Sequence, residues 1–211
     1  MEKIKSTLYA TFLIMTILIG FAFALAVNAK TISASKAENI KPLEKGEAID
    51  ASKKTEAKTL IVYFSLSGNT RYIAQKIQNK LDCDIFELET LTPYPSDRDE
   101  ITTVAKKEIE NNILPELKQN IDIKDYNKIF VGTPVWWYSM SPAIRTFLSN
   151  NDFAGKAIVP FITHGGGGEY NIAKEMGNLA KGSTVLKSIS FYGKGNSNID
   201  AEINAWLKEV K

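Results

Sequence analysis

The sequence predicts an α/β domain built on a doubly wound, five-stranded parallel sheet in the order 2-1-3-4-5, with helices on both faces. Two observations lead to this fold class. From residue 59 to residue 211, short apolar segments typical of strands alternate with segments of helical periodicity, which indicates a parallel sheet covered on both sides. The connections between them are short, and right-handed crossovers then favour a doubly wound order. This stretch has the usual length of one domain.

The first strand and the turn after it are the most informative part of this domain. Residues 60–64 form a short apolar run suited to a central strand, and apolar residues from Ile73 to Leu81 recur at helical spacing. Between strand and helix lies a turn of small hydroxyl, glycine and asparagine residues. Its backbone N–H groups, its hydroxyls and the positive end of the helix suit a phosphate dianion. The candidate phosphate-binding residues are Ser65, Ser67, Gly68, Asn69 and Thr70.

The composition of this turn separates it from two other phosphate-binding loops. A nucleoside-triphosphate loop requires the pattern G-x-x-x-x-G-K-[ST], and a dinucleotide-binding turn requires three glycines. The turn has neither pattern. A hydroxyl-rich loop without a lysine suits a phosphate monoester that is held rather than transferred, and FMN is such a ligand. The alternative is a tight strand-to-helix turn in which Asn69 or Thr70 caps the helix.

The remaining elements follow the first strand at regular intervals. Ser96 and Asp99 have the spacing of a capping box, which predicts a helix that ends before Pro115. Ser141 and Pro142 are expected to start the next helix. The four further strands are expected at 84–88, 128–132, 157–162 and 184–191, and the last two helices at 172–180 and 199–210.

Three consecutive aromatic residues follow the predicted third strand, at the carboxyl end of the sheet. Aromatic faces there can stack on a planar flavin ring, and neighbouring backbone groups can reach the ring's polar edge. The alternative is that Trp136 or Trp137 only covers the edge of the sheet. The candidate ring-binding residues are Thr133, Pro134, Val135, Trp136, Trp137 and Tyr138.

A glycine-rich segment follows the predicted fourth strand. Its glycines, residues 165–168, let the backbone approach a ligand closely, although a flexible surface loop can have the same composition. From His164, the only histidine, we expect a ring-edge hydrogen bond or a structural cap rather than catalysis. All three loops lie at one edge of the predicted sheet, which favours a shared binding site. The candidate residues of this third loop are Thr163, His164, Gly165, Gly166 and Gly167.

Several strings in this domain resemble the flavodoxin-like family of FMN-binding proteins. They are Ser-x-Ser-Gly-Asn-Thr at 65–70, Gly-Thr-Pro-Val-Trp-Trp at 132–137, Asp-Phe-Ala-Gly-Lys at 152–156 and Pro-Phe-Ile-Thr-His-Gly-Gly at 160–166. The resemblance covers 59–211. It implies that the first loop holds the FMN phosphate, residues 134–137 the isoalloxazine ring, and residues 163–167 its pyrimidine side. The sequence departs from the family at Tyr138, where members often have glycine, and at Gly167, where they often have serine.

The N-terminal region predicts export. Lys3 and Lys5 precede a charge-free segment, residues 6–29, that ends in the small residues read by a signal peptidase. We expect a signal peptide at 1–29, and the long apolar run leaves a signal anchor that tethers the protein to the membrane as the alternative. Residues 30–58 are typical of a flexible charged linker, and 59–211 form the FMN-binding domain. The expected location is extracytoplasmic, either secreted or anchored at the outer face of the cytoplasmic membrane.

The composition argues against a nucleic-acid-binding protein, because the net charge is +2 and the charges are interspersed without a basic stripe. Cys83 is the only cysteine, so the chain offers neither an intramolecular disulfide nor a dithiol redox couple. We expect electron transfer or flavin-dependent reduction, with an unidentified redox donor and acceptor and no catalytic side chain. The alternatives are an NAD(P)H-dependent reductase of quinones or small molecules, and a non-enzymatic FMN-storage or partner-binding module.

Overall fold

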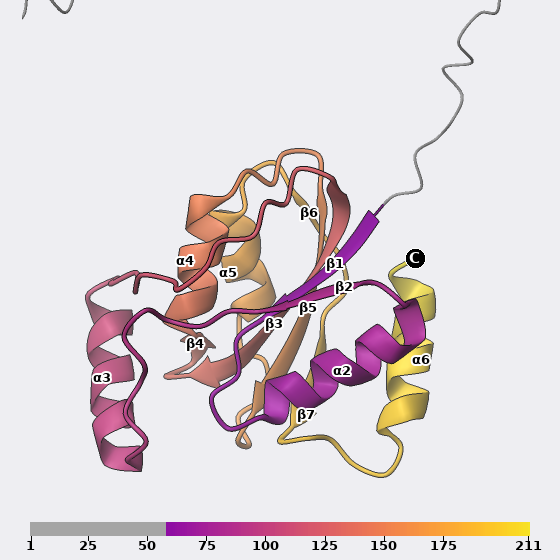
Figure 1. Cartoon of the computed structure of the whole chain (residues 1–211). Helices are drawn as coiled ribbons and strands as arrows, with labels where there is room; N and C mark the ends of the chain where they lie inside the picture. Colours follow the sequence, from indigo (N-terminus) through magenta and orange to yellow (C-terminus); the bar gives the residue numbers. More distant parts are fainter. Residues whose placement is uncertain (1–57) are drawn as a thin grey trace, which may run out of the picture. The chain divides into compact units, whose positions relative to one another are not determined.

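The computed structural model describes residues 58–211 of the chain, and Figure 1 shows their arrangement. The signal peptide or anchor predicted at 1–29, and all but the last residue of the linker predicted at 30–58, lie outside the described residues. Over the described range, the helices lack the combination of length and apolar character that crossing a bilayer requires. The elements are, in chain order, β1 (Lys58–Tyr63), α2 (Asn69–Leu81), β2 (Asp84–Glu87), α3 (Arg98–Glu110), β3 (Tyr126–Trp136), β4 (Ser139–Met140), α4 (Pro142–Asn150), β5 (Ala157–His164), α5 (Ile172–Leu179), β6 (Thr184–Val185), β7 (Ile189–Tyr192) and α6 (Ile199–Glu209).

The main strands run parallel in the order β2-β1-β3-β5, with β6 and β7 following each other along the outer side of β5. This confirms the predicted order, with the fifth strand divided in two and a short antiparallel strand, β4, added beside the end of β3. The division lies at residues 186–188, where the carbonyl of Lys187 accepts a hydrogen bond from Nε1 of Trp206 (2.8 Å). Within residues 58–211 the sheet therefore has seven strands, where the sequence predicted five.

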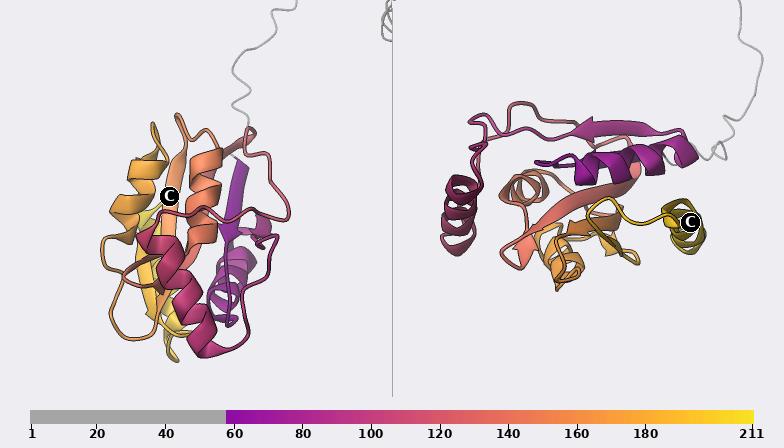
Figure 2. Two further views of the ribbon diagram at one scale, coloured as in Figure 1. Left: turned by 90° about the vertical axis from the view of Figure 1, so that its left-hand side faces the viewer. Right: turned by 90° about the horizontal axis from the view of Figure 1, so that it is seen from below.

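Alternate residues of β1 face two separate hydrophobic cores. Leu60 and Val62 pack into the core that α4 and α5 cover, whereas Ile61 and Tyr63 pack into the core under α2 and α6. This alternation, with a period of two, buries both faces of the sheet. Figure 2 shows the helices on the two sides.

Helix α3 lies beside the end of the sheet, at the left of Figure 1. Its N-cap is Asp97, whose carboxylate accepts hydrogen bonds from the N–H groups of Asp99 (2.9 Å) and Glu100 (3.0 Å). The capping box predicted from Ser96 and Asp99 is therefore wrong by one residue, because aspartate caps a helix as well as serine does. The helix ends before Pro115, as predicted.

The third strand extends beyond its predicted end at Gly132 as far as Trp136. Val135 and Trp136 pair with the two residues of β4, which turns the predicted aromatic loop into a hairpin. Because β1, β3 and β5 are parallel neighbours, their carboxyl ends meet at one edge of the sheet. The strand β1 begins at the opposite edge, at Lys58.

Candidate functional site

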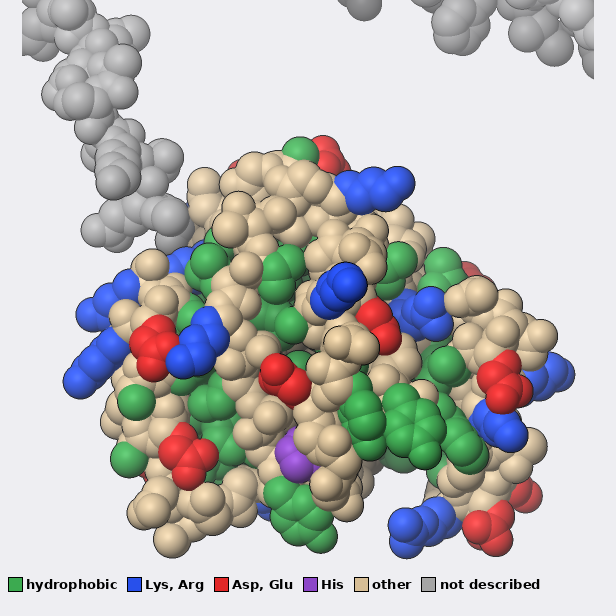
Figure 3. Space-filling model, turned by 180° about the vertical axis from the view of Figure 1, so that it is seen from behind, with side chains coloured by type: hydrophobic (Ala, Val, Ile, Leu, Met, Phe, Trp, Pro, Cys, Tyr) green, Lys and Arg blue, Asp and Glu red, His purple; other side chains and the backbone are tan. Residues whose placement is uncertain are grey.

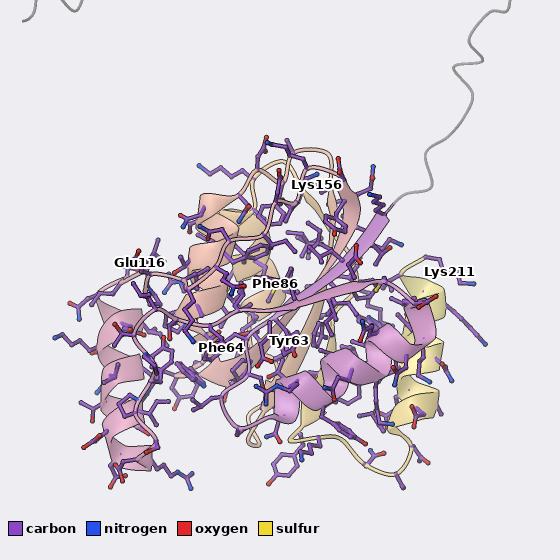
Figure 4. All side chains as sticks on the ribbon, viewed as in Figure 1. Tyr63, Phe64, Phe86, Glu116, Lys156 and Lys211 are labelled. Atoms are coloured by element: carbon purple, nitrogen blue, oxygen red, sulfur yellow. The ribbon has the colours of Figure 1, made fainter. Side chains whose placement is uncertain are left out.

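The first loop, residues 64–68, connects the end of β1 to the start of α2. Figure 4 shows Tyr63 and Phe64 at the end of the strand, close to the start of the helix. Gly68 is the N-cap residue, with a φ of 83°, and no side chain caps the helix, so the predicted alternative of a cap by Asn69 or Thr70 is wrong. The first N–H groups of a helix have no intrahelical partners. Those of α2 can therefore bind a ligand.

Three of the predicted phosphate-binding residues carry hydroxyls; those of Ser65 and Thr70 are buried, whereas that of Ser67 is exposed. Ser65 is only 9% exposed, and its Oγ has no hydrogen-bond partner among the residues that the structure describes. Oγ1 of Thr70 lies 2.9 Å from Oγ1 of Thr163, which joins the start of α2 to the end of β5. A buried hydroxyl without a partner costs about 1–3 kcal/mol. An anionic group from outside the chain could accept hydrogen bonds from this hydroxyl and from the first N–H groups of α2.

The second loop is the turn of the β3–β4 hairpin. Trp137 and Tyr138 occupy it with φ values of 45° and 66°, the two positive angles that a type I′ turn requires. Residues other than glycine adopt this conformation at a cost of roughly 1–2 kcal/mol, and such strain gathers at functional sites. The departure from glycine at Tyr138 therefore adds strain beside the candidate site.

The two tryptophans have different surroundings. Trp136 packs edge-on against Phe64 and Tyr94, with ring centroids 5.5 Å and 4.9 Å away, so its ring belongs mainly to the core. Trp137 donates from Nε1 to the carbonyl of Thr102 (3.0 Å), and it is 41% exposed. The alternative in which a tryptophan covers the sheet therefore describes Trp136, while the exposed ring of Trp137 has Nζ of Lys106 5.2 Å from its centroid.

The third loop, residues 165–171, follows β5 and contains the four glycines. Nδ1 of His164 accepts a hydrogen bond from the N–H of Gly166 (3.2 Å), which is one of the two roles expected for this histidine. A Cβ on Gly167 would lie 1.8 Å from Oη of Tyr170, so the position of that ring requires glycine. The ring of Tyr170 also contacts that of Tyr138, with centroids 5.2 Å apart, and thereby joins the third loop to the hairpin.

Thr133 connects the start of the hairpin to the residue before α4. Its side chain is fully buried. Its Oγ1 accepts a hydrogen bond from the N–H of Ser141 (2.9 Å) and lies within hydrogen-bonding distance of the carbonyl of Pro134 (2.9 Å). Thr133 thus holds β3 against the start of α4.

A groove of about 300 Å³ lies between the first loop, the hairpin and helix α3. The hairpin residues in it belong to the predicted site, whereas sequence reasoning missed the wall that α3 forms. Figure 3, which shows the molecule from behind, has hydrophobic side chains gathered beside the single histidine. The groove is lined by Leu66, Arg98, Ile101, Thr102, Ala105, Val135, Trp136 and Trp137.

A hydrogen-bonded network of charged groups lies beside the first loop. Tyr63 donates from Oη to Glu87 (2.9 Å), and Arg71 donates to both oxygens of the same carboxylate. Burial, followed by the bond to Glu87, raises the pKa of Tyr63 to about 12, so the phenol is protonated at neutral pH. Arg71 was not among the predicted site residues, although it directly follows Thr70 in the sequence.

Comparison with known proteins identifies the family. Residues 58–210 match the sequence model of a flavodoxin family. The chain belongs to the flavodoxin family. The family predicted from the loop strings is thereby confirmed. No curated protein matches the chain.

Solved structures of similar proteins cover nearly three quarters of this chain. A protein from Bacteroides eggerthii, described as a flavoprotein, is 27% identical with a TM-score of 0.64, over 72% of this chain and 96% of its own. A flavoprotein from Lactobacillus acidophilus, solved in complex with FMN, is 26% identical with a TM-score of 0.57, over 72% of this chain and 99% of its own. Both proteins match this chain over nearly their whole length.

Proposed function

We propose that this flavodoxin-family protein binds FMN non-covalently at the carboxyl edge of its sheet and passes electrons through it. The observation that carries the proposal is Oγ of Ser65, which is buried without a partner among the described residues, beside the uncapped start of α2. A phosphate monoester supplies acceptors for both groups. The similar flavoprotein that was solved with FMN supports the identity of the ligand.

Each loop would meet a different part of FMN. The exposed ring of Trp137 would stack on the flavin, and the backbone N–H groups of residues 165–167 would reach the flavin's polar edge. When bound, FMN supplies one-electron and two-electron redox chemistry. The protein would position the ring and exclude water from the side that packs against the hairpin. The phosphate would be held by Ser65, Ser67, Gly68, Asn69 and Thr70.

We also propose that the protein acts outside the cytoplasm, either secreted or anchored at the outer face of the cytoplasmic membrane. Lys3 and Lys5, followed by the charge-free residues 6–29, support export. The redox donor and acceptor would then be met outside the cytoplasm. Sequencing the N-terminus of the mature protein from cell fractions tests this. A start at Lys30 in an extracytoplasmic fraction supports it, and a cytosolic chain that keeps residues 1–29 contradicts it.

A second candidate is an NAD(P)H-dependent reductase of quinones or other small molecules. The observation that favours it is the groove beside the exposed side chain of Trp137. A reductase must expose one face of the flavin to nicotinamide and acceptor, whereas an electron carrier needs to expose only an edge.

Anaerobic absorbance titration of the FMN-loaded full-length protein separates the two candidates. In a carrier, dithionite bleaches the flavin and neither NADH nor NADPH does so. In a reductase, one of the nicotinamides bleaches it, and an added quinone restores the absorbance. A protein that retains no flavin after incubation with FMN would contradict the FMN proposal. The partner-binding module would then be the remaining alternative.

A further inference from the structure

Arg71 has an unexpected position for an arginine. It stands in the first turn of α2, directly after the proposed phosphate-binding residues. A cation at the start of a helix is opposed by the helix dipole, so helix formation alone does not account for it. The residues around it indicate what it does there.

Two neighbours fix the direction of the guanidinium group. Nε and Nη2 of Arg71 donate to the two carboxylate oxygens of Glu87 (2.7 Å and 2.5 Å). Oη of Tyr63 donates to the same carboxylate (2.9 Å), and Tyr63 and Glu87 are register partners at the ends of β1 and β2. The sheet therefore holds the carboxylate, and a bidentate pair of this kind orients the planar guanidinium.

The remaining nitrogen, Nη1, lies against the first loop. It is 3.8 Å from the point that a Cβ on Gly68 would occupy. The bonds that Arg71 makes within residues 58–211 use Nε and Nη2, so Nη1 keeps its hydrogens for another acceptor. The ion pair is neutral overall, but its positive end is next to the loop. Residues 64–70 contain no other cation.

We propose that Arg71 is a specificity residue for the phosphate of FMN, donating a charge-assisted hydrogen bond from Nη1 and so separating FMN from riboflavin. The inference rests on the proposed function, because it requires the first loop to hold the phosphate. Glu87 and Tyr63 are positioning residues that keep the guanidinium beside Gly68. The ordinary alternative is an ion pair that only joins α2 to β2, which would leave the choice of ligand unchanged.

The test compares the dissociation constants of FMN and riboflavin for the full-length protein and two variants. The ratio of the two constants measures what the phosphate contributes. Arg71→Gln should lower this ratio about tenfold, the effect of losing one charge-assisted hydrogen bond, and leave riboflavin binding unchanged. Lys76→Gln is the matched control, because it removes one cation and one ion pair, with Asp200 (2.8 Å), from the same helix. It should leave the ratio at the parent's value.

Two results would count against the proposal. A ratio in Arg71→Gln equal to the parent's would overturn the role of Arg71, and if both ligands are weakened equally, the role of Arg71 is structural. If the parent itself binds FMN and riboflavin equally, the phosphate-binding loop of the proposed function fails as well. Added salt should bring the ratios of the parent and of Arg71→Gln closer together. The Arg71 side chain is 45% exposed, so dissolved ions can screen its charge.

Discussion

Replacing Ser65 by alanine should make the flavin-free protein more stable and its complex with FMN weaker. The Ser65 hydroxyl is buried and has no partner among residues 58–211, and such a group costs about 1–3 kcal/mol. Its removal should therefore raise the free energy of unfolding by about 1–2 kcal/mol, which corresponds to roughly 2–4 °C in Tm for each kcal/mol. The same change removes a hydrogen bond to a phosphate oxygen, which is worth about 1.5–3 kcal/mol, or about 10- to 150-fold in Kd.

Thermal unfolding of the flavin-free protein and fluorescence titration with FMN measure the two effects. Ser67→Ala is the matched control, because the Ser67 hydroxyl is exposed and its loss should leave Tm unchanged. Riboflavin affinity should change little in either variant. A lower Tm together with an unchanged Kd for FMN in Ser65→Ala would refute the reasoning, because the hydroxyl would then be satisfied within the folded protein.

Three further predictions concern the other loops and the end of β1. Gly167→Ser should destabilise the protein by about 1 kcal/mol, because its Cβ would overlap Oη of Tyr170 and displace this exposed side chain. Tyr170→Ala should rescue it in urea unfolding, and no rescue would contradict the cause. Trp137→Ala should restore much of the quenched fluorescence of bound FMN. Trp136→Ala should lower the free energy of unfolding by about 3 kcal/mol and leave the flavin fluorescence quenched. The reverse pattern would mean that Trp136 stacks on the flavin and Trp137 does not. The raised pKa of Tyr63, about 12, means that the folded protein holds this proton more tightly than the unfolded chain. This difference contributes about 3 kcal/mol to the free energy of unfolding. The contribution is complete below about pH 10 and is lost as the pH rises to about 12. Urea unfolding of Tyr63→Phe should lack this part of the decline, and an equal decline in both proteins would contradict the assignment.

The order of the sheet and the three loops were predictable because they depend on patterns local in the chain. The apolar run 60–64 and the turn 65–70 are recognisable from a few neighbouring residues, and parallel strands must place their carboxyl ends together. Features that depend on distant contacts were missed. The division of the fifth strand depends on the bond from Trp206 to Lys187, and the wall formed by α3 depends on the bond from Trp137 to Thr102.

The candidate site was predictable as a set of loops but not as a set of roles. Composition cannot show that Trp136 packs into an aromatic cluster while Trp137 stays open, because the two residues are adjacent and identical. Composition also cannot show that Arg71 turns towards the loop, because the carboxylate that orients it comes from β2. Contact of the predicted residues with FMN stays a prediction that the variants above can test.

The domain begins at one edge of the sheet, and this position determines where a surface or a fused domain can be attached without covering the groove. Lys58 begins β1, and a strand of six residues spans about 20 Å before the chain reaches the first loop. Lys211 lies at the same edge as Lys58, since it lines a cavity together with Thr59. A bead, an electrode or a reporter domain attached at Lys58 or at Lys211 would therefore lie at the edge opposite the groove beside Trp137.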